Sequence, residues 1–173
     1  MERTHENGTL RLANVGEKVT LVGWVAKRRN LGSLVFIDLR DRSGIVQLTF
    51  DESIADAVKD VRNEYILQVT GTVEKRKEAN PKIATGEIEI HVESVNIVNS
   101  AETAPITIAD DTDTSEDTRL KYRYLDLRRS VLQQNMILRH KVCMVARNVL
   151  DKQGFVEIET PILARSTPEG ARD

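Results

Sequence analysis

Short stretches in which apolar and polar residues alternate follow one another over residues 17–98. Successive side chains of a strand point to opposite faces, so "LVFIDLRD" (34–41) predicts a strand with one apolar and one mixed face. Phe36 lies on the mixed face, beside Asp38 and Arg40. A phenyl ring among charged side chains on the outside of a small sheet requires an explanation.

Four further stretches have the composition and alternation of strands. They are residues 19–28, 45–50, 65–76 and 87–95. Between the third and fourth strands, residues 53–61 have the apolar spacing of a short helix, with Ser53 as a candidate N-cap. Gly71 indicates a bend in the fourth strand. Five strands with a helix in this position predict an all-β, five-stranded OB-fold barrel; an open five-stranded meander with a packed helix is the alternative.

The pattern changes after the predicted barrel. Residues 100–118 are acidic, lack periodicity and predict a linker. The stretch 131–154 then has apolar residues at helical spacing and ends in Gly154, with Cys143 on its apolar face and therefore expected in a core. Residues 155–161 predict a strand. One helix and one strand cannot bury a core alone, so we expect this region to be the start of a larger domain.

Composition excludes several classes of function. The net charge of −2 provides no global field that would attract nucleic acid, so such binding requires a local patch. A single cysteine excludes an internal disulfide framework and a cysteine metal site, and fits the cytoplasm. No apolar run approaches the roughly 18 residues of a membrane span, so no membrane partner is expected. No glycine-rich phosphate loop or nucleophilic triad is present.

The outward positions of the predicted strands have the chemistry of a single-stranded nucleic-acid site. An aromatic ring offers a base a stacking surface, a glutamine amide offers a donor and an acceptor, and arginines bind phosphates or stack on bases. The residues concerned are Arg28, Arg29, Phe36, Gln47, Arg76 and Glu89. Some of these residues also have an ordinary interpretation. Another segment would cap Phe36, "KRR" would be a solvated surface run, and Glu89 would be an edge residue. Two functional interpretations stand beside a sequence-specific site. One is a free-standing module that binds single-stranded nucleic acid without sequence preference, and the other is a fragment that only dimerises through 131–161.

The order of several motifs is similar to that of a known family. The stretches "GWVAKRRNLGSLVFIDLRDRSGIVQLTF", "LKYRYLDLRR" and "GFVEIETPILARSTPEGARD" resemble the N-terminal part of bacterial-type aspartyl-tRNA synthetase, a class II aminoacyl-tRNA synthetase. "RYLDLRR" and "TPEGARD" are the most specific; the barrel segment alone would also fit lysyl and asparaginyl relatives. The resemblance covers nearly the whole chain and implies an OB-fold barrel followed by the start of a class II α+β catalytic domain.

The resemblance also implies roles for single residues. In this family the OB domain binds the anticodon loop of tRNA-Asp. Phe36 matches the ring that stacks on an anticodon base, and Gln47 matches the glutamine that reads the central uridine. Arg28 and Arg29 match the basic stretch beside the anticodon. Arg76 and Glu89 also match positions at this loop.

The C-terminal stretch implies a division into domains. We expect an anticodon-binding domain over 1–99, a hinge over 100–118 and the start of a catalytic domain over 119–173. Pro161 matches the proline of motif 1, which forms the dimer interface, and Glu169 matches the glutamate that contacts L-aspartate. Motifs 2 and 3, which hold ATP, are absent, so the resemblance assigns L-aspartate, ATP and Mg2+ binding to a longer, homodimeric parent enzyme. The fragment itself is expected to bind no cofactor and to contain no catalytic residue.

Overall fold

The structure divides into two compact units. It is a computed structural model that describes residues 2–163, and the units are Met1–Thr107 and Ile108–Asp173. Each unit is described by itself. The boundary between them falls within the segment expected to be a linker, and no helix or strand lies between Asn99 and Glu116.

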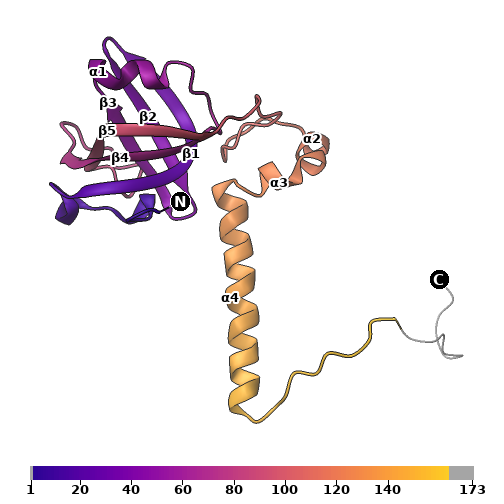
Figure 1. Ribbon diagram of the computed structural model, residues 1–173. Coiled ribbons are helices and arrows are strands. Elements are labelled where there is room, and N and C mark those ends of the chain that lie inside the picture. The colour runs from indigo at the N-terminus through magenta and orange to yellow at the C-terminus, as the bar shows by residue number, and fades with distance from the viewer. Residues whose placement is uncertain (1, 164–173) are drawn as a thin grey trace, which may run out of the picture. The chain divides into compact units, whose positions relative to one another are not determined.

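The first unit is a closed five-stranded barrel (Figure 1). Its strands are β1 (Lys18–Leu31), β2 (Leu34–Asp41), β3 (Gly44–Phe50), β4 (Ile66–Lys75) and β5 (Ile88–Asn99). Around the barrel they follow the order β1-β2-β3-β5-β4, and β1 also pairs with β4. All pairs are antiparallel except β3 with β5, which is parallel. The OB-type barrel expected from the alternation is therefore confirmed, and the open meander is not formed.

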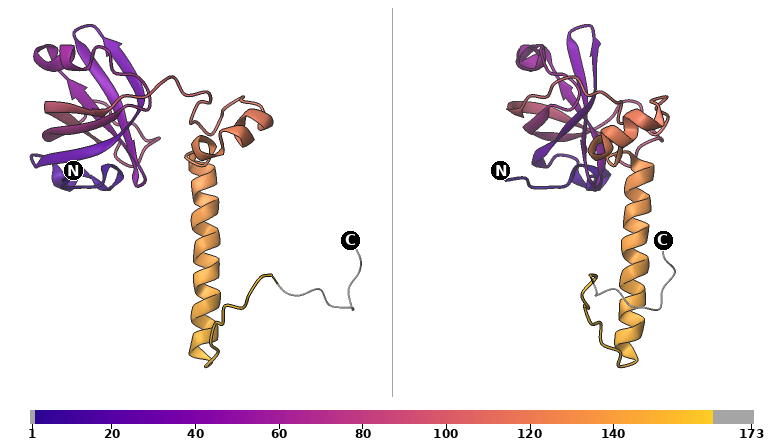
Figure 2. Two further views of the ribbon diagram at one scale, coloured as in Figure 1. Left: turned by 45° about the vertical axis from the view of Figure 1, so that its right-hand side comes forward. Right: turned by 90° about the vertical axis from the view of Figure 1, so that its right-hand side faces the viewer.

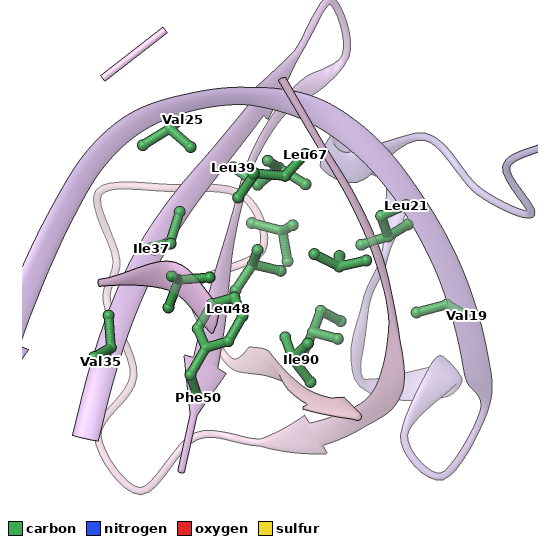
Figure 3. Packing of buried hydrophobic residues seen from close by; sticks show 14 of the residues in the cluster. Val19, Leu21, Val25, Val35, Ile37, Leu39, Leu48, Phe50, Leu67 and Ile90 are labelled. Carbon is green, nitrogen blue, oxygen red and sulfur yellow. The ribbon is translucent and has the colours of Figure 1, made fainter. Parts of the chain in front are cut away.

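The apolar parity of each strand fills the barrel interior. Leu48, Phe50 and Ile90 are completely buried and point toward one another in Figure 3. On β2 the odd-numbered apolar residues are buried and Phe36 is only half-buried, as the alternation predicts. Burial of this apolar surface is the main favourable contribution to folding of the unit.

Gly71 lies where β4 and β5 approach each other most closely. The register of this pair shifts between Thr70 and Gly71, and a Cβ atom on Gly71 would collide with the backbone oxygen of His91. The bend expected at Gly71 is therefore a bulge with close backbone contact, which only glycine accommodates.

The helix between β3 and β4 is present but shorter than predicted. It consists of α1 (Glu52–Ala55) and a 3-10 turn, η3 (Asp56–Val58), whose Val58 is fully buried in the core. Its N-cap is Asp51, and the expectation of Ser53 is wrong. Asp51 has extended backbone angles and its carboxylate accepts the Ser53 N–H at 2.9 Å, which is the geometry of an N-cap.

Residues before β1 fasten the turn between β2 and β3. They form two 3-10 turns, η1 (Asn7–Thr9) and η2 (Leu12–Asn14). The backbone N–H of Asn7 donates to Asp41 at 2.9 Å, and that of Gly8 donates to the Ser43 hydroxyl at 2.8 Å. These bonds satisfy buried polar groups at one end of the barrel.

The second unit is helical in its described part. It contains α2 (Glu116–Lys121), α3 (Arg123–Asp126) and α4 (Ser130–Lys152), the last drawn as one long helix in Figure 2. The long helix was predicted, and Gly154 follows it with the positive φ of +85° that favours glycine at a helix end. The side chain of Asp126 is fully buried and accepts from Arg123 and Arg129 at 2.9 and 3.0 Å, so the "RYLDLRR" stretch is held by an internal ion-pair cluster.

Two expectations for this unit are wrong for one physical reason. Cys143 is exposed rather than in a core, because no residue of α4 is buried within the described structure. Residues 155–161 form no strand, since a strand requires a hydrogen-bonded neighbour and the described part of this unit offers none. Within residues 2–163, no helix has the length and apolar character needed to cross a membrane.

Truncation of a core leucine tests this packing. Leu48→Ala should lower the free energy of unfolding of the barrel by about 2–5 kcal/mol, because it leaves a cavity between the strands. The matched control is Leu31→Ala, since Leu31 is 65% exposed and its truncation should change stability by less than about 0.5 kcal/mol. Chemical denaturation monitored by Trp24 fluorescence measures both, and equal effects would contradict the assigned core.

Candidate nucleic-acid interface

Phe36 occupies the centre of a polar outer face on the barrel. In the strand register it is paired with Arg29 of β1 on one side and with Thr49 of β3 on the other. Its ring is half-buried, so one part packs on the barrel and another remains accessible. No described segment covers it completely, and a flat aromatic surface is thus presented among hydrogen-bonding groups.

Gln47 is the centre of a hydrogen-bond network beside this ring. Its side-chain oxygen accepts from Arg76 Nη2 at 2.9 Å and from Arg29 Nη2 at 3.2 Å. Its side-chain nitrogen donates to Glu89 Oε2 at 2.7 Å. Gln47 is only 5% exposed, so its amide is held by these neighbours and has little access to bulk water.

Two further side chains support the network from its edges. Asp38, whose backbone partner across the strands is Gln47, accepts from Arg29 Nη2 at 2.6 Å. The Thr49 hydroxyl donates to Glu89 Oε2 at 2.9 Å. Strand parity points both side chains outward, but neither residue is among those predicted for the site. The cross-strand pairing of Asp38 with Gln47 is the signal that identifies the first.

Arg76 reaches the network because the loop after β4 is folded back. The Arg76 N–H donates to the Glu87 carbonyl at 2.9 Å, and the buried Thr85 hydroxyl donates to the Ile45 carbonyl at 2.6 Å. These bonds attach the loop to β3 and bring the Arg76 guanidinium to Gln47. Five side chains from separate parts of the sequence thus meet at one place: Arg29, Asp38, Gln47, Arg76 and Glu89.

Arg28 points elsewhere. Its Nε donates to the Val58 carbonyl at 3.1 Å, so its side chain lies against the short η3 turn and away from the Gln47 network. Arg28 and Arg29 are neighbours in sequence, and adjacent strand residues face opposite sides. The structure therefore brings Arg29, Phe36, Gln47, Arg76 and Glu89 together and leaves Arg28 at a different position on the same strand.

Burial changes the titration of one carboxylate in this face. Desolvation raises the pKa of Asp38 above its usual value, and the nearby positive charges of Arg29, Arg76 and Lys27 oppose this rise without cancelling it. Removal from water disfavours the charged form, which is the reason for the direction. The face therefore combines donor-rich arginines with partly desolvated acceptors.

The remaining predicted positions lie in the second unit. Pro161 is described and exposed, and Glu169 lies outside the described residues. Among residues 2–163, no group of three or more His, Cys, Asp or Glu side chains is arranged to hold a metal ion.

Comparison with known protein families gives a match in each unit. Residues 19–98 match the model of an OB-fold nucleic acid binding domain, and residues 115–173 match the model of class II tRNA synthetases (D, K and N). The first match includes all the residues of the Gln47 network.

Similar individual proteins cover the chain from end to end. It is 56% identical to the aspartate–tRNA ligase of Ruminiclostridium cellulolyticum, over 100% of the chain and 30% of that protein. It is 54% identical to the aspartate–tRNA(Asp/Asn) ligase of Bacillus thuringiensis, over 99% of the chain and 30% of that protein. The solved aspartyl-tRNA synthetase of Entamoeba histolytica superposes with a TM-score of 0.82 at 26% identity, over 91% of the chain and 40% of that structure. The chain thus spans about a third of the length of the curated relatives.

The raised pKa of Asp38 predicts a pH dependence of stability. A carboxyl whose pKa is higher in the folded state binds more protons when folded, so its contribution to stability is lost as pH rises. We compare the free energy of unfolding of the unmodified chain with that of Asp38→Asn. The first minus the second should increase as pH falls from the raised pKa of Asp38 in the folded state toward its usual value of about 3.9.

Asp51 provides a control of opposite sign. Its pKa is lowered, first by the hydrogen bond from the Ser53 side chain, so its contribution should be lost as pH falls. Denaturation curves of Asp38→Asn and Asp51→Asn over the same pH series measure both differences. The raised pKa of Asp38 would be contradicted if the difference in unfolding free energy between the unmodified chain and Asp38→Asn did not grow on acidification.

Proposed function

Because the chain belongs to the aspartyl-tRNA synthetase family, we propose that its barrel binds the anticodon loop of tRNA-Asp. The observation that carries this proposal is the Gln47 network beside Phe36. A stacking surface next to an amide, two guanidinium groups and two carboxylates has the chemistry with which proteins read unpaired RNA bases.

In this proposal each residue of the face has a separate role. Phe36 stacks on an anticodon base, and the Gln47 amide pairs with the edge of the central uridine. Arg29 and Arg76 place donors, and Glu89 places an acceptor, around the Gln47 amide beside that base. Arg28, which lies against the η3 turn, would contact the phosphate backbone at the margin of the loop.

The proposed domain organisation follows the same family. Residues 1–99 would form the anticodon-binding domain, 100–118 a hinge, and 119–173 the start of the catalytic domain with motif 1. In a longer parent enzyme, α4 and Pro161 would form the interface with a second copy. The many exposed apolar residues of α4, among them Ile137, Leu138 and Val145, support this role.

The activity proposed for the parent enzyme is aspartate–tRNA ligation in the cytoplasm. The carboxylate of L-aspartate would attack the α-phosphate of ATP, forming an aspartyl-adenylate and releasing pyrophosphate. The terminal ribose hydroxyl of tRNA-Asp would then accept the aspartyl group, with release of AMP. Mg2+ would offset the negative charge of the ATP phosphates. Glu169 would contact the ammonium group of L-aspartate, and no described residue of this chain is assigned to ATP or Mg2+.

Binding to two RNA stem-loops tests anticodon recognition. The chain should prefer a stem-loop with the anticodon GUC to one in which the central U is replaced by C, at the same moderate salt concentration. Phe36→Ala should lower affinity by about 1–3 kcal/mol through lost stacking, and Gln47→Ala should abolish the preference for U. Fluorescence anisotropy with labelled stem-loops measures each dissociation constant.

Gln68→Ala is the matched control for Gln47→Ala. Gln68 lies on β4 and donates to the Glu2 carbonyl, outside the Gln47 network, so both affinity and preference should be retained. Equal binding of both stem-loops by the parent chain, with a steep salt dependence, would instead indicate a nonspecific nucleic-acid-binding module.

A second experiment addresses catalysis. The 173-residue chain should show no aspartate-dependent exchange of pyrophosphate into ATP, because the family residues that hold ATP are not found in its sequence. A complete aspartate–tRNA ligase assayed in parallel is the positive control. Exchange above background by the chain alone would contradict this prediction.

A further inference from the structure

The amide of Gln47 is restricted to one of its two orientations. Arginine side chains contain only donors and an ionised carboxylate contains only acceptors. The oxygen of Gln47 must therefore face Arg29 and Arg76, and its nitrogen must face Glu89, as the contacts at 3.2, 2.9 and 2.7 Å have it. A flipped amide would direct N–H groups at arginine donors and an oxygen at a carboxylate.

We propose that Glu89 and Arg76 are positioning residues that lock the Gln47 amide and thereby make the barrel select uridine over cytidine. This inference rests on the proposed function and deepens it. It assigns discrimination between the two pyrimidines to the groups behind the glutamine as well as to the glutamine itself.

The locked orientation matters because the two bases present opposite patterns. The Watson–Crick edge of uracil presents a carbonyl acceptor at position 4 and an N–H donor at position 3, and cytosine presents a donor and an acceptor at the same positions. An amide held in one orientation pairs with uracil and opposes cytosine in the same place. An amide free to flip would pair with either base and lose discrimination.

The network leaves the amide able to accept a base. Arg29 makes the longer of the two contacts to the Gln47 oxygen, and the same nitrogen is already bonded to Asp38 at 2.6 Å. Arg29 therefore keeps an ionic partner when a uracil N–H takes its place on that oxygen. The Gln47 nitrogen has two hydrogens and uses one for Glu89, so the other is free to donate to a uracil carbonyl.

Burial makes the lock strong. With only 5% of Gln47 exposed, water has little room to compensate a flipped amide, and unpaired buried polar groups are costly. Glu89 is itself held, because its Oε2 accepts from the Thr49 hydroxyl at 2.9 Å as well as from Gln47. The orientation of the Gln47 amide is therefore fixed by Glu89 of β5, which Thr49 of β3 holds in place.

Replacement of Glu89 by glutamine is the central test. The new amide either accepts or donates, so residue 89 no longer opposes the flipped Gln47 and only the arginine donors do. Glu89→Gln should lower the preference for the GUC over the GCC stem-loop by roughly 3- to 10-fold, and addition of Arg76→Gln should lower it further. The ratio of the two dissociation constants is the readout, since loss of a phosphate contact weakens both complexes equally.

Two controls separate positioning from other effects. Glu93→Gln makes the same change of charge on the same strand, but Glu93 bonds Lys18 and Thr72, so the ratio should stay unchanged. In a Gln47→Ala background, Glu89→Gln should not change the ratio, because a positioning residue acts through Gln47. An equal fall in both backgrounds would mean that Glu89 contacts the base directly and would overturn the inference.

The outcomes distinguish this inference from the proposed function. If the unmodified 173-residue chain binds both stem-loops equally, both anticodon recognition and the proposed lock on Gln47 are overturned. A different outcome overturns only the lock: the unmodified chain prefers GUC, Gln47→Ala abolishes that preference, and Glu89→Gln leaves it intact. Glu89→Asp, which keeps an acceptor-only group, should retain more of the preference than Glu89→Gln.

A measurement on the unmodified chain guards against misfolded variants. Thermal unfolding checks each variant, and hydrogen exchange of glutamine side-chain amides by NMR tests the lock without substitution. The Gln47 side-chain N–H groups should exchange more slowly with solvent than those of Gln68. Equal exchange rates would overturn the proposed restriction of the amide.

Discussion

The parallel pairing of β3 with β5 is the interaction on which the polar face depends. It joins Leu48 to Ile90 and Thr49 to His91 in register, and this closes the barrel. Closure buries the apolar faces of both strands and, on the outside, brings Glu89 to the side chains of Gln47 and Thr49. The same contact that completes the core thus assembles the network, because alternate residues of each strand serve the two faces.

Most polar groups of the network are paired before any ligand arrives, although Arg29 Nε and Arg76 Nη1 are buried and have no hydrogen-bond partner among the described residues. Buried amides, guanidinium groups and carboxylates are costly when unpaired, and the Gln47 amide is paired at both its oxygen and its nitrogen. A site built in this way is preorganised, and a base that bound there would have to replace existing hydrogen bonds. Such replacement favours a ligand whose donors and acceptors match the fixed order and penalises one that does not. In the proposed complex, this exchange would reduce affinity and increase selectivity.

The second unit is stabilised differently along its length. Its "RYLDLRR" stretch is fixed by the buried Asp126 and its two arginines, whereas α4 has apolar residues that no described element covers. Many exposed apolar residues on one helix are unfavourable in water and are typical of a helix that packs on another domain or subunit. The match of residues 115–173 to class II synthetases, together with relatives about three times as long as this chain, supports that interpretation.

The sequence by itself determined the local features of this protein. Alternation of apolar residues specified the strands of the barrel and the outward position of Phe36 and Gln47, because side-chain direction in a strand depends only on residue parity. Helical spacing and Gly154 specified α4 for similar local reasons. Tertiary structure decided which outward residues meet. The N-cap at Asp51, the departure of Arg28 from the network and the convergence of Arg76, Gln47 and Glu89 depend on register, loop folding and barrel closure, which join residues far apart in the chain and leave no periodic signal in it.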